Sequence, residues 1–271
     1  MRTSAAPLST AKAATITKVF LDVLEFVTLV FFVVRHAVRT LTARGAMLAI
    51  LLVIGSSAEG AGRVVTFRAD DGRMLSGLLM EADRRPAPAV VLVPMLGRPK
   101  DDWQAVAQRL AEANITALAI DLPGTTAPED PKELARWSED IRAAVAYLVS
   151  RPAEVRATSI GVAGASLGGS LAVIEAAGDE AVRAIALISP SLDYRGVRIE
   201  APLRSYGARP ALLVASARDS YAARSTRELA QDTQGPRDIR WSDVAAHGTV
   251  LLSRDPDLVR SLVEWFQGML G

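Results

Sequence analysis

Three residues of this chain have the types needed for nucleophilic chemistry. Ser166 lies between Gly164 and Gly168, and Asp219 and His247 follow it along the sequence. A serine hydroxyl needs a base to become a nucleophile, a histidine supplies that base near neutral pH, and a carboxylate holds the histidine in the required tautomer. These residues predict acyl transfer, with Ser166 as nucleophile, His247 as general base and then acid, and Asp219 as the group that orients His247.

The sequence around Ser166 has the local pattern that such a nucleophile requires. A strand-like apolar run, Ser159–Ala163, precedes it, and a helix-like run, Ser170–Ala177, follows it. A strained turn from strand to helix leaves little room for side chains, which accounts for the glycines on both sides. The simpler alternative is a glycine-rich turn that is kept tight for packing alone.

The two partner residues also have simpler alternatives. Of the two histidines in the chain, His36 lies in the N-terminal segment, whereas His247 follows the last expected strand and precedes a helix. That position favours a catalytic role for His247 over a structural one. Asp219 follows a strand and could instead cap a helix. Asp243, within the last expected strand, is the nearest competing carboxylate.

From residue 62 onward, strand and helix patterns alternate as expected for an α/β fold, with a mostly parallel sheet and helices on both of its faces. The first two strands, joined by a turn at Asp70–Gly72, should form an antiparallel pair. The expected strands are Arg63–Arg68, Met74–Met80, Ala89–Pro94, Ile115–Ile120, Ser159–Ala163, Val182–Ile188, Ala211–Ala215 and Ile239–Val244.

Acidic residues mark the starts of three expected helices. Asp101 should cap one helix with help from Gln104, Asp130 should cap a second over Pro131–Ser150, and Asp255 should cap the closing helix.

This arrangement resembles the α/β-hydrolase superfamily over residues 63–270. The residues that carry the resemblance are Gly164–Gly169, Asp219, and His247 in its Ala246–Gly248 setting. The chain looks most like the compact, lidless bacterial members related to dienelactone hydrolases and small esterases. Dienelactone hydrolases use a cysteine nucleophile, and this chain contains no cysteine. Only the broader kinship therefore carries over, and it implies an α/β-hydrolase domain over residues 62–271 without a large cap domain.

The resemblance also implies main-chain donors for the oxyanion of acyl transfer. One would be the N–H of Leu167, and the other the N–H of Leu96 or Met95, in the loop after the third strand. The family often has His-Gly at this place, where this chain has Pro94 and Met95. Because the donors are main-chain groups, the missing histidine does not exclude the mechanism. The choice between Met95 and Leu96 stays open.

Few side chains stand out as substrate contacts. Arg98 and Lys100 would suit an anionic substrate group, although two solvated charges before a helix are the simpler interpretation. Residues 191–209 are too few for a helical cap, so the pocket should be open or covered by one loop. Tyr194 and Tyr206 in this loop are possible pocket walls, with ordinary packing as the default.

Residues 1–61 form a separate segment that we expect to be a signal or a membrane-associated region. Two apolar runs, Val19–Val34 and Ala46–Ile54, flank a cationic stretch. The first run contains acidic residues and suits a membrane-surface helix, whereas the second resembles the core of a secretory signal with cleavage after Ala58. Cleavage, with a later translation start, and a retained anchor through residues 16–54 are both open. Either outcome predicts a bacterial protein that is exported, to the periplasm or outside the cell, or membrane-anchored.

Composition excludes several other classes of function. The 271 residues carry a net charge of only +1, and the basic excess belongs to residues 1–61. The body therefore offers no broad basic patch for nucleic acid. The absence of cysteine removes thiol chemistry and disulfides. We expect no metal and no organic cofactor.

The sequence thus predicts a serine hydrolase, similar to carboxylesterases, that cleaves an ester of a small or medium acyl group through an acyl-enzyme at Ser166. Amidases, peptidases, thioesterases and acyltransferases use the same apparatus and stay open as alternatives. A noncatalytic, membrane-tethered binding protein on the same scaffold is the rival from another class. Reactions that need an aspartate nucleophile are disfavoured, because this position is serine.

Overall fold

The computed structural model describes residues 62–231 and 235–271. The two apolar runs, the signal or anchor and the boundary at residue 61 lie outside the described residues and stay predictions. Within the described ranges, no helix has the length and apolar character needed to cross a membrane.

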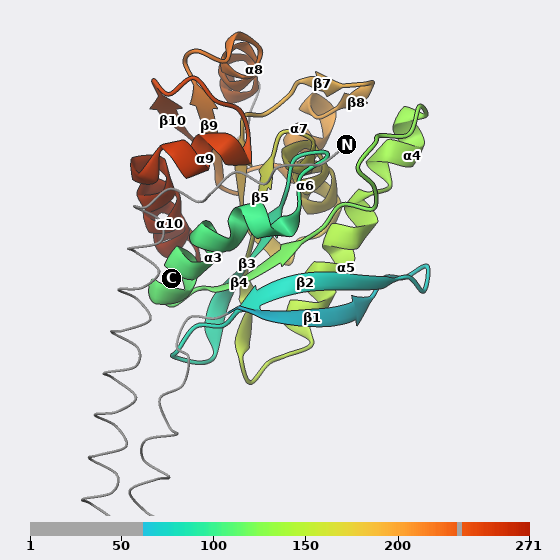
Figure 1. Ribbon diagram of the computed structural model, residues 1–271, viewed down its shortest axis with the longest axis vertical. Helices are drawn as coiled ribbons and strands as arrows, with labels where there is room; N and C mark the ends of the chain where they lie inside the picture. The colour runs from blue at the N-terminus through green and yellow to red at the C-terminus, as the bar shows by residue number, and fades with distance from the viewer. Residues whose placement is uncertain (1–61, 232–234) are drawn as a thin grey trace, which may run out of the picture. The chain divides into compact units, whose positions relative to one another are not determined.

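One eight-stranded sheet organises the domain (Figure 1). Its order in space is β1-β2-β4-β3-β5-β6-β9-β10. The strands β4, β3, β5, β6, β9 and β10 run parallel to one another, and β2 is antiparallel to both of its neighbours, β1 and β4. The mostly parallel sheet expected from the sequence is confirmed. The strands are β1 (Arg63–Arg68), β2 (Met74–Met80), β3 (Ala87–Val93), β4 (Thr116–Ile120), β5 (Val155–Ala165), β6 (Val182–Ile188), β9 (Ala211–Ser216) and β10 (Arg237–Ser242).

Helices cover both faces of this sheet (Figure 1). Apolar residues of α5, α6, α7 and α8 share one buried cluster with the sheet, and those of α3, α9 and α10 share the other. The helices are η1 (Lys100–Trp103, a 3₁₀ turn), α3 (Gln104–Glu112), α4 (Pro131–Ala135), α5 (Ser138–Val149), α6 (Leu167–Gly178), α7 (Glu200–Tyr206), α8 (Ser220–Gln231), α9 (Thr249–Arg254) and α10 (Pro256–Leu270). A small hairpin, β7 (Asp193–Tyr194) with β8 (Val197–Arg198), precedes α7.

The central strands are buried on both faces. In β3, Val91 and Val93 join one apolar cluster, and Val90 and Leu92 join the other, all with no exposed area. Successive side chains of a strand point to opposite faces, so a strand covered on both sides needs apolar residues throughout. This explains why these strands are continuous apolar runs in the sequence.

Several strand boundaries differ from the sequence prediction, and those of β5 and β10 are informative. β5 begins at Val155, before the apolar run that starts at Ser159, because Val155 pairs with Ala87; the register then shifts before the next pair, Ala89 with Ile160. β10 ends at Ser242, so Asp243 lies after the last strand and not within it. Backbone hydrogen bonds set the ends of a strand, whereas the sequence pattern reports only side-chain hydrophobicity.

The helix expected over Pro131–Ser150 is two helices, α4 and α5. Between them the N–H of Trp137 donates to the carbonyl of Leu134, a three-residue step that tightens the chain. The Trp137 ring also lies against Gly124, where a side chain would be in close contact with it. The break between α4 and α5 therefore coincides with the packing of the Trp137 ring against Gly124. Helical periodicity in the sequence does not reveal this contact.

Two of the three expected helix caps are present. Asp130 accepts from the N–H of Lys132, and Asp255 accepts from the N–H of Leu258. The cap expected at Asp101 was wrong. That residue lies inside η1, which begins after Pro99 without a side-chain cap.

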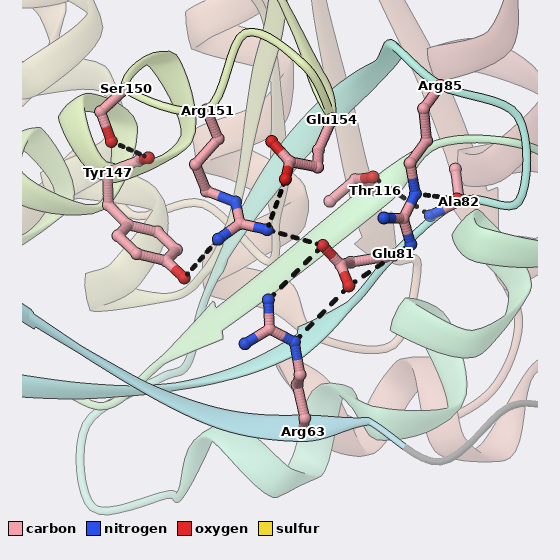
Figure 2. A network of polar contacts seen from close by, with 9 residues as sticks. All are labelled: Arg63, Glu81, Ala82, Arg85, Thr116, Tyr147, Ser150, Arg151 and Glu154. Atoms are coloured by element: carbon pink, nitrogen blue, oxygen red, sulfur yellow. Dashed lines mark hydrogen bonds and ion pairs between the residues drawn. The ribbon is translucent and has the colours of Figure 1, made fainter. Parts of the chain in front are cut away.

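A carboxylate beside β2 joins separate parts of the chain (Figure 2). Glu81 faces the guanidinium groups of Arg151 at 2.8 Å, Arg85 at 3.4 Å and Arg63 at 3.5 Å. Burial alone raises the pKa of Glu81, but these arginines outweigh it, and the pKa is lowered. The ion pairs tie β1 and the end of β2 to the segment after α5.

We predict that Glu81→Gln lowers the free energy of unfolding by about 1 kcal/mol at pH 7, because three arginines lose their ion pair with Glu81 and, in the part of the chain that the structure describes, only Arg151 keeps another carboxylate, that of Glu154. Because the folded-state pKa is lowered, the carboxylate stabilises the fold above its unfolded-state pKa of about 4.3, and this stabilisation is lost as the pH falls through the folded-state pKa. Urea unfolding at pH 7 and at about pH 3 measures both effects.

The matched control is Glu112→Gln, because Glu112 is half exposed and its ion pair is with Arg109 on the same helix. It should change the free energy of unfolding by less than about 0.5 kcal/mol. Equal effects of the two substitutions, or a Glu81→Gln effect that grows on acidification, would contradict the role given to Glu81.

Candidate active site

Ser166 occupies the turn between β5 and α6. Its φ of 51° and ψ of −118° lie in a region that non-glycine residues rarely adopt, and only 8% of the residue is exposed. Its N–H donates to the carbonyl of Ile188, the last residue of β6, at 2.8 Å. The hydrogen bond holds the strained turn against the neighbouring strand. Such local strain is maintained where the surrounding structure fixes the backbone.

The glycines around Ser166 are required by close backbone contacts. A Cβ atom on Gly164 would lie within 3.0 Å of the main chain at Gly168 and Gly169. One on Gly168 would lie within 3.0 Å of the carbonyl oxygens of Val93 and Pro94, at the end of β3. The first turn of α6 therefore rests directly on the backbone of the adjacent strand, as the sequence pattern indicated.

Asp219 and His247 are brought together from loops that follow β9 and β10. Nδ1 of His247 lies 2.5 Å from Oδ2 of Asp219. The Asp219 side chain is 17% exposed and the His247 side chain 44% exposed. A carboxylate at Nδ1 fixes a tautomer that leaves Nε2 free to accept a proton. Among residues 62–231 and 235–271, no other carboxylate lies within ion-pair distance of this histidine.

Asp219 is also the helix cap that the sequence offered as the alternative. Its Oδ1 accepts from the N–H of Ala222 at 3.2 Å, in the first turn of α8, while Oδ2 faces His247. The two roles are compatible because they use different oxygens. Capping also fixes the direction of the carboxylate, which prepares it to orient the imidazole.

The loop that carries His247 lies against the serine turn. A Cβ atom on Gly248 would be 3.7 Å from the Cβ of Ala165, the residue before Ser166, and closer than 3.0 Å to Sδ of Met95. Gly248 has a φ of 57° and is buried. The residues that flank the serine and the histidine are therefore in contact, although they lie far apart in the sequence.

Main-chain donors converge on the same place. Leu167 is the first residue of α6, so its N–H has no partner within the helix. In the described part of the chain, the N–H groups of Met95 and Leu96 donate to no acceptor either. The contact of Gly168 with Pro94 sets these two groups of donors side by side. The choice between Met95 and Leu96 stays open.

The comparisons with known proteins assign the family. The model for the "Alpha/beta hydrolase family" matches residues 90–268. This chain belongs to the alpha/beta hydrolase family. The predicted kinship and fold are thereby confirmed. No curated protein matches the chain by sequence.

Solved structures of esterases share the architecture of this alpha/beta hydrolase. A dienelactone hydrolase from Anabaena variabilis is 20% identical, with a TM-score of 0.65 over 79% of this chain and 100% of that one. The esterase domain of a Rhodothermus marinus protein is 22% identical, with a TM-score of 0.62 over 77% and 99%. A Pyrococcus furiosus esterase is 16% identical, with a TM-score of 0.65 over 78% and 91%. At these identities the likeness shows the fold alone.

The two cations that could have met an anionic substrate in this alpha/beta hydrolase, Arg98 and Lys100, are engaged in ion pairs. Arg98 lies 2.6 Å from Asp102, and Lys100 lies 2.6 Å from Asp121. Asp102 also accepts from the hydroxyl of Thr249, two residues after the histidine, at 2.8 Å. These pairs favour a structural role for both cations over recognition of an anionic substrate.

The segment over residues 191–209 of the hydrolase is the small hairpin and α7, as expected for a member without a large cap domain. Tyr206 is not a pocket wall, because it is 2% exposed and its hydroxyl donates to the carbonyl of Pro210 at 2.8 Å. Tyr194 is partly buried against the core. The hydroxyl of Tyr221 holds the hairpin by donating to the carbonyl of Asp193 at 2.9 Å.

We predict that Gly168→Ala destabilises this hydrolase by about 1–3 kcal/mol, because the new methyl group would overlap the carbonyls at the end of β3. Gly178→Ala is the control in the same helix, since a Cβ there meets open space. It should be neutral or stabilising by up to about 1 kcal/mol. Urea unfolding of both variants measures the difference, and equal stabilities would disprove the steric argument.

Proposed function

We propose that this alpha/beta hydrolase is a serine hydrolase, similar to carboxylesterases, that cleaves an ester of a small or medium acyl group. The observation that carries the proposal is the 2.5 Å contact between His247 and Asp219, in a loop that packs beside the Ser166 turn. A histidine that is oriented by a carboxylate and lies next to a serine at a strand-to-helix turn is the arrangement that activates a serine hydroxyl.

In the proposed acylation step, Oγ of Ser166 attacks the ester carbonyl carbon while Nε2 of His247 takes the hydroxyl proton. The negative charge that develops on the carbonyl oxygen is stabilised by the N–H of Leu167 together with that of Met95 or Leu96. The tetrahedral intermediate collapses, the bond to the leaving oxygen breaks, and His247 returns the proton to the departing alcohol. Asp219 stabilises the imidazolium in between.

In the proposed deacylation step, His247 takes a proton from water, and the resulting hydroxide attacks the acyl carbon on Ser166. Collapse of the second tetrahedral intermediate releases the carboxylic acid, and the proton on His247 returns to Oγ of Ser166. Every proton is balanced by groups of this chain and water, so the scheme uses no metal and no organic cofactor.

An ester is the preferred substrate class because its alkoxide leaving group needs less assistance than an amine. The names of the structural neighbours, a dienelactone hydrolase and two esterases, support the same class. Amide, peptide or thioester cleavage and acyl transfer would use the same groups. If the labelling test described next fails, the alternative of a noncatalytic binding protein is favoured.

We predict that a fluorophosphonate adds once to the folded full-length protein, as measured by intact mass, and that Ser166→Ala abolishes the adduct. His247→Ala should slow labelling on the order of 10²- to 10⁴-fold. Ser170→Ala is the matched control, because Ser170 lies one turn further along α6 and is fully buried. It should label like the wild type. No adduct on folded wild-type protein would favour the binding-protein alternative.

We further predict that Asp219→Asn slows labelling by about 10²- to 10⁴-fold, while Asp243→Asn leaves the rate unchanged. Asparagine can still cap α8, so the substitution removes the charge at His247 without removing the cap. The time course of labelling at pH 7 measures both rates. Equal slowing by the two substitutions, or slowing by Asp243→Asn alone, would show that Asp219 is not the orienting group.

A further inference from the structure

Ser189 is a buried serine in an unusual conformation beside the candidate site. It directly follows β6, the strand next to the nucleophile strand β5. It has no exposed area, and its φ is 50°. A non-glycine residue in this region carries strain, which persists where the surrounding structure fixes the residue. Glycine would adopt this φ without strain, so the serine side chain should have a function of its own at this position.

The contacts of Ser189 indicate this function. Its N–H donates to the carbonyl of Val214 in β9 at 2.7 Å, which fixes its backbone. Its hydroxyl accepts the N–H of Gly248 at 2.9 Å, in a buried hydrogen bond. Gly248 is the residue after His247. The side chain of Ser189 thus holds the histidine loop to the end of β6.

The two adjacent residues Ile188 and Ser189 hold both the serine turn and the histidine loop. The carbonyl of Ile188 accepts the N–H of Ser166, and the hydroxyl of Ser189, the next residue, accepts the N–H of Gly248. Both hydrogen bonds start from adjacent positions of one strand end. The distance between the serine turn and the histidine loop is therefore set by a short and rigid piece of backbone.

Among the described residues, no other group accepts the N–H of Gly248. On its other side, Gly248 lies against the sulfur of Met95, with no room for a side chain. Without the hydroxyl of Ser189, the buried N–H would lose its acceptor and the loop would lose its anchor on this side. A loop released there can relax in a direction that takes His247 away from Ser166.

We propose that Ser189 is a positioning residue that sets the place of His247 relative to Ser166 through the N–H of Gly248. The proposal rests on the proposed function, since it assigns Ser189 to the base of that reaction. In this role Ser189 acts through Gly248 and not on the reacting atoms. Its hydroxyl, and not merely a filled space after β6, is what the site requires.

Two substitutions separate positioning from simple stability. Ser189→Ala and Ser189→Gly both remove the hydroxyl, but glycine also relieves the cost of the positive φ. The glycine variant should therefore be the more stable of the two. If Ser189 positions the histidine, both variants should lose fluorophosphonate labelling rate by a similar factor of about 10- to 100-fold, because a displacement near 1 Å can cost that much.

Thr116→Val is the matched control (Figure 2). The hydroxyl of Thr116 also accepts a buried main-chain N–H, that of Ala82, at 3.1 Å. It does so at the first residue of β4, the opposite end of a parallel strand from the candidate site. This variant should be destabilised yet label at the wild-type rate per folded molecule.

A second measurement reports on the histidine without any reaction. In full-length protein with His36→Gln, His247 is the single histidine, so a ¹⁵N-histidine spectrum contains one ring. The proton on Nδ1, held by Asp219, should be protected from exchange in the wild type and in Thr116→Val. It should exchange faster in both Ser189 variants.

The outcomes separate this proposal from the proposed function. Absence of labelling in the wild type would refute the serine hydrolase, while the ring proton would still test the placement of His247. The positioning role would be overturned if both Ser189 variants were labelled at the wild-type rate and their ring proton exchanged at the wild-type rate. The role would also be overturned if the loss of labelling rate paralleled the loss of folding stability, so that the more stable glycine variant was labelled nearly as fast as the wild type.

Discussion

The close approach of two backbones, at the first turn of α6 and the end of β3, is the constraint on which the rest of the site depends. Gly168 lies so near the carbonyls of Val93 and Pro94 that a methyl group would overlap them. This contact turns the chain sharply and forces Ser166 into a strained conformation. It also places the N–H of Leu167 beside the loop after β3. One steric requirement thus shapes the serine turn and brings the neighbouring main-chain donors close to it.

The histidine loop is joined to the same loop after β3 by two independent contacts. Met95 packs against Gly248, and Asp102 bridges Arg98 to Thr249. Burial alone raises the pKa of Asp102, but hydrogen bonds from Arg98 and Thr249 outweigh it, and the pKa is lowered. The bridge is therefore charged at neutral pH. The proposed base and the main-chain donors are held as one unit, which favours a preorganised site over one assembled by closure.

The sequence predicts the sheet and the pairing of Asp219 with His247 because both follow from residue type and order. Buried strands must be apolar, and polar residues after parallel strands gather at one edge of the sheet. Ser189 could not be found this way. Serine after a strand is common, and its role depends on a positive φ and on a partner in another loop. The choice between Met95 and Leu96 likewise depends on main-chain geometry, which the residue letters do not encode, and it stays open.

The unequal exposure of the proposed nucleophile and base has a consequence for the fate of an acyl-enzyme. Ser166 is 8% exposed, whereas the His247 side chain is 44% exposed. The base therefore borders bulk solvent, and water from this solvent is the reactant of the proposed deacylation step. Acyl transfer to an alcohol or amine competes better with hydrolysis in a site from which water is excluded. An imidazole open to solvent on one side biases the partition of the intermediate toward the free acid, so the architecture favours hydrolysis over transfer.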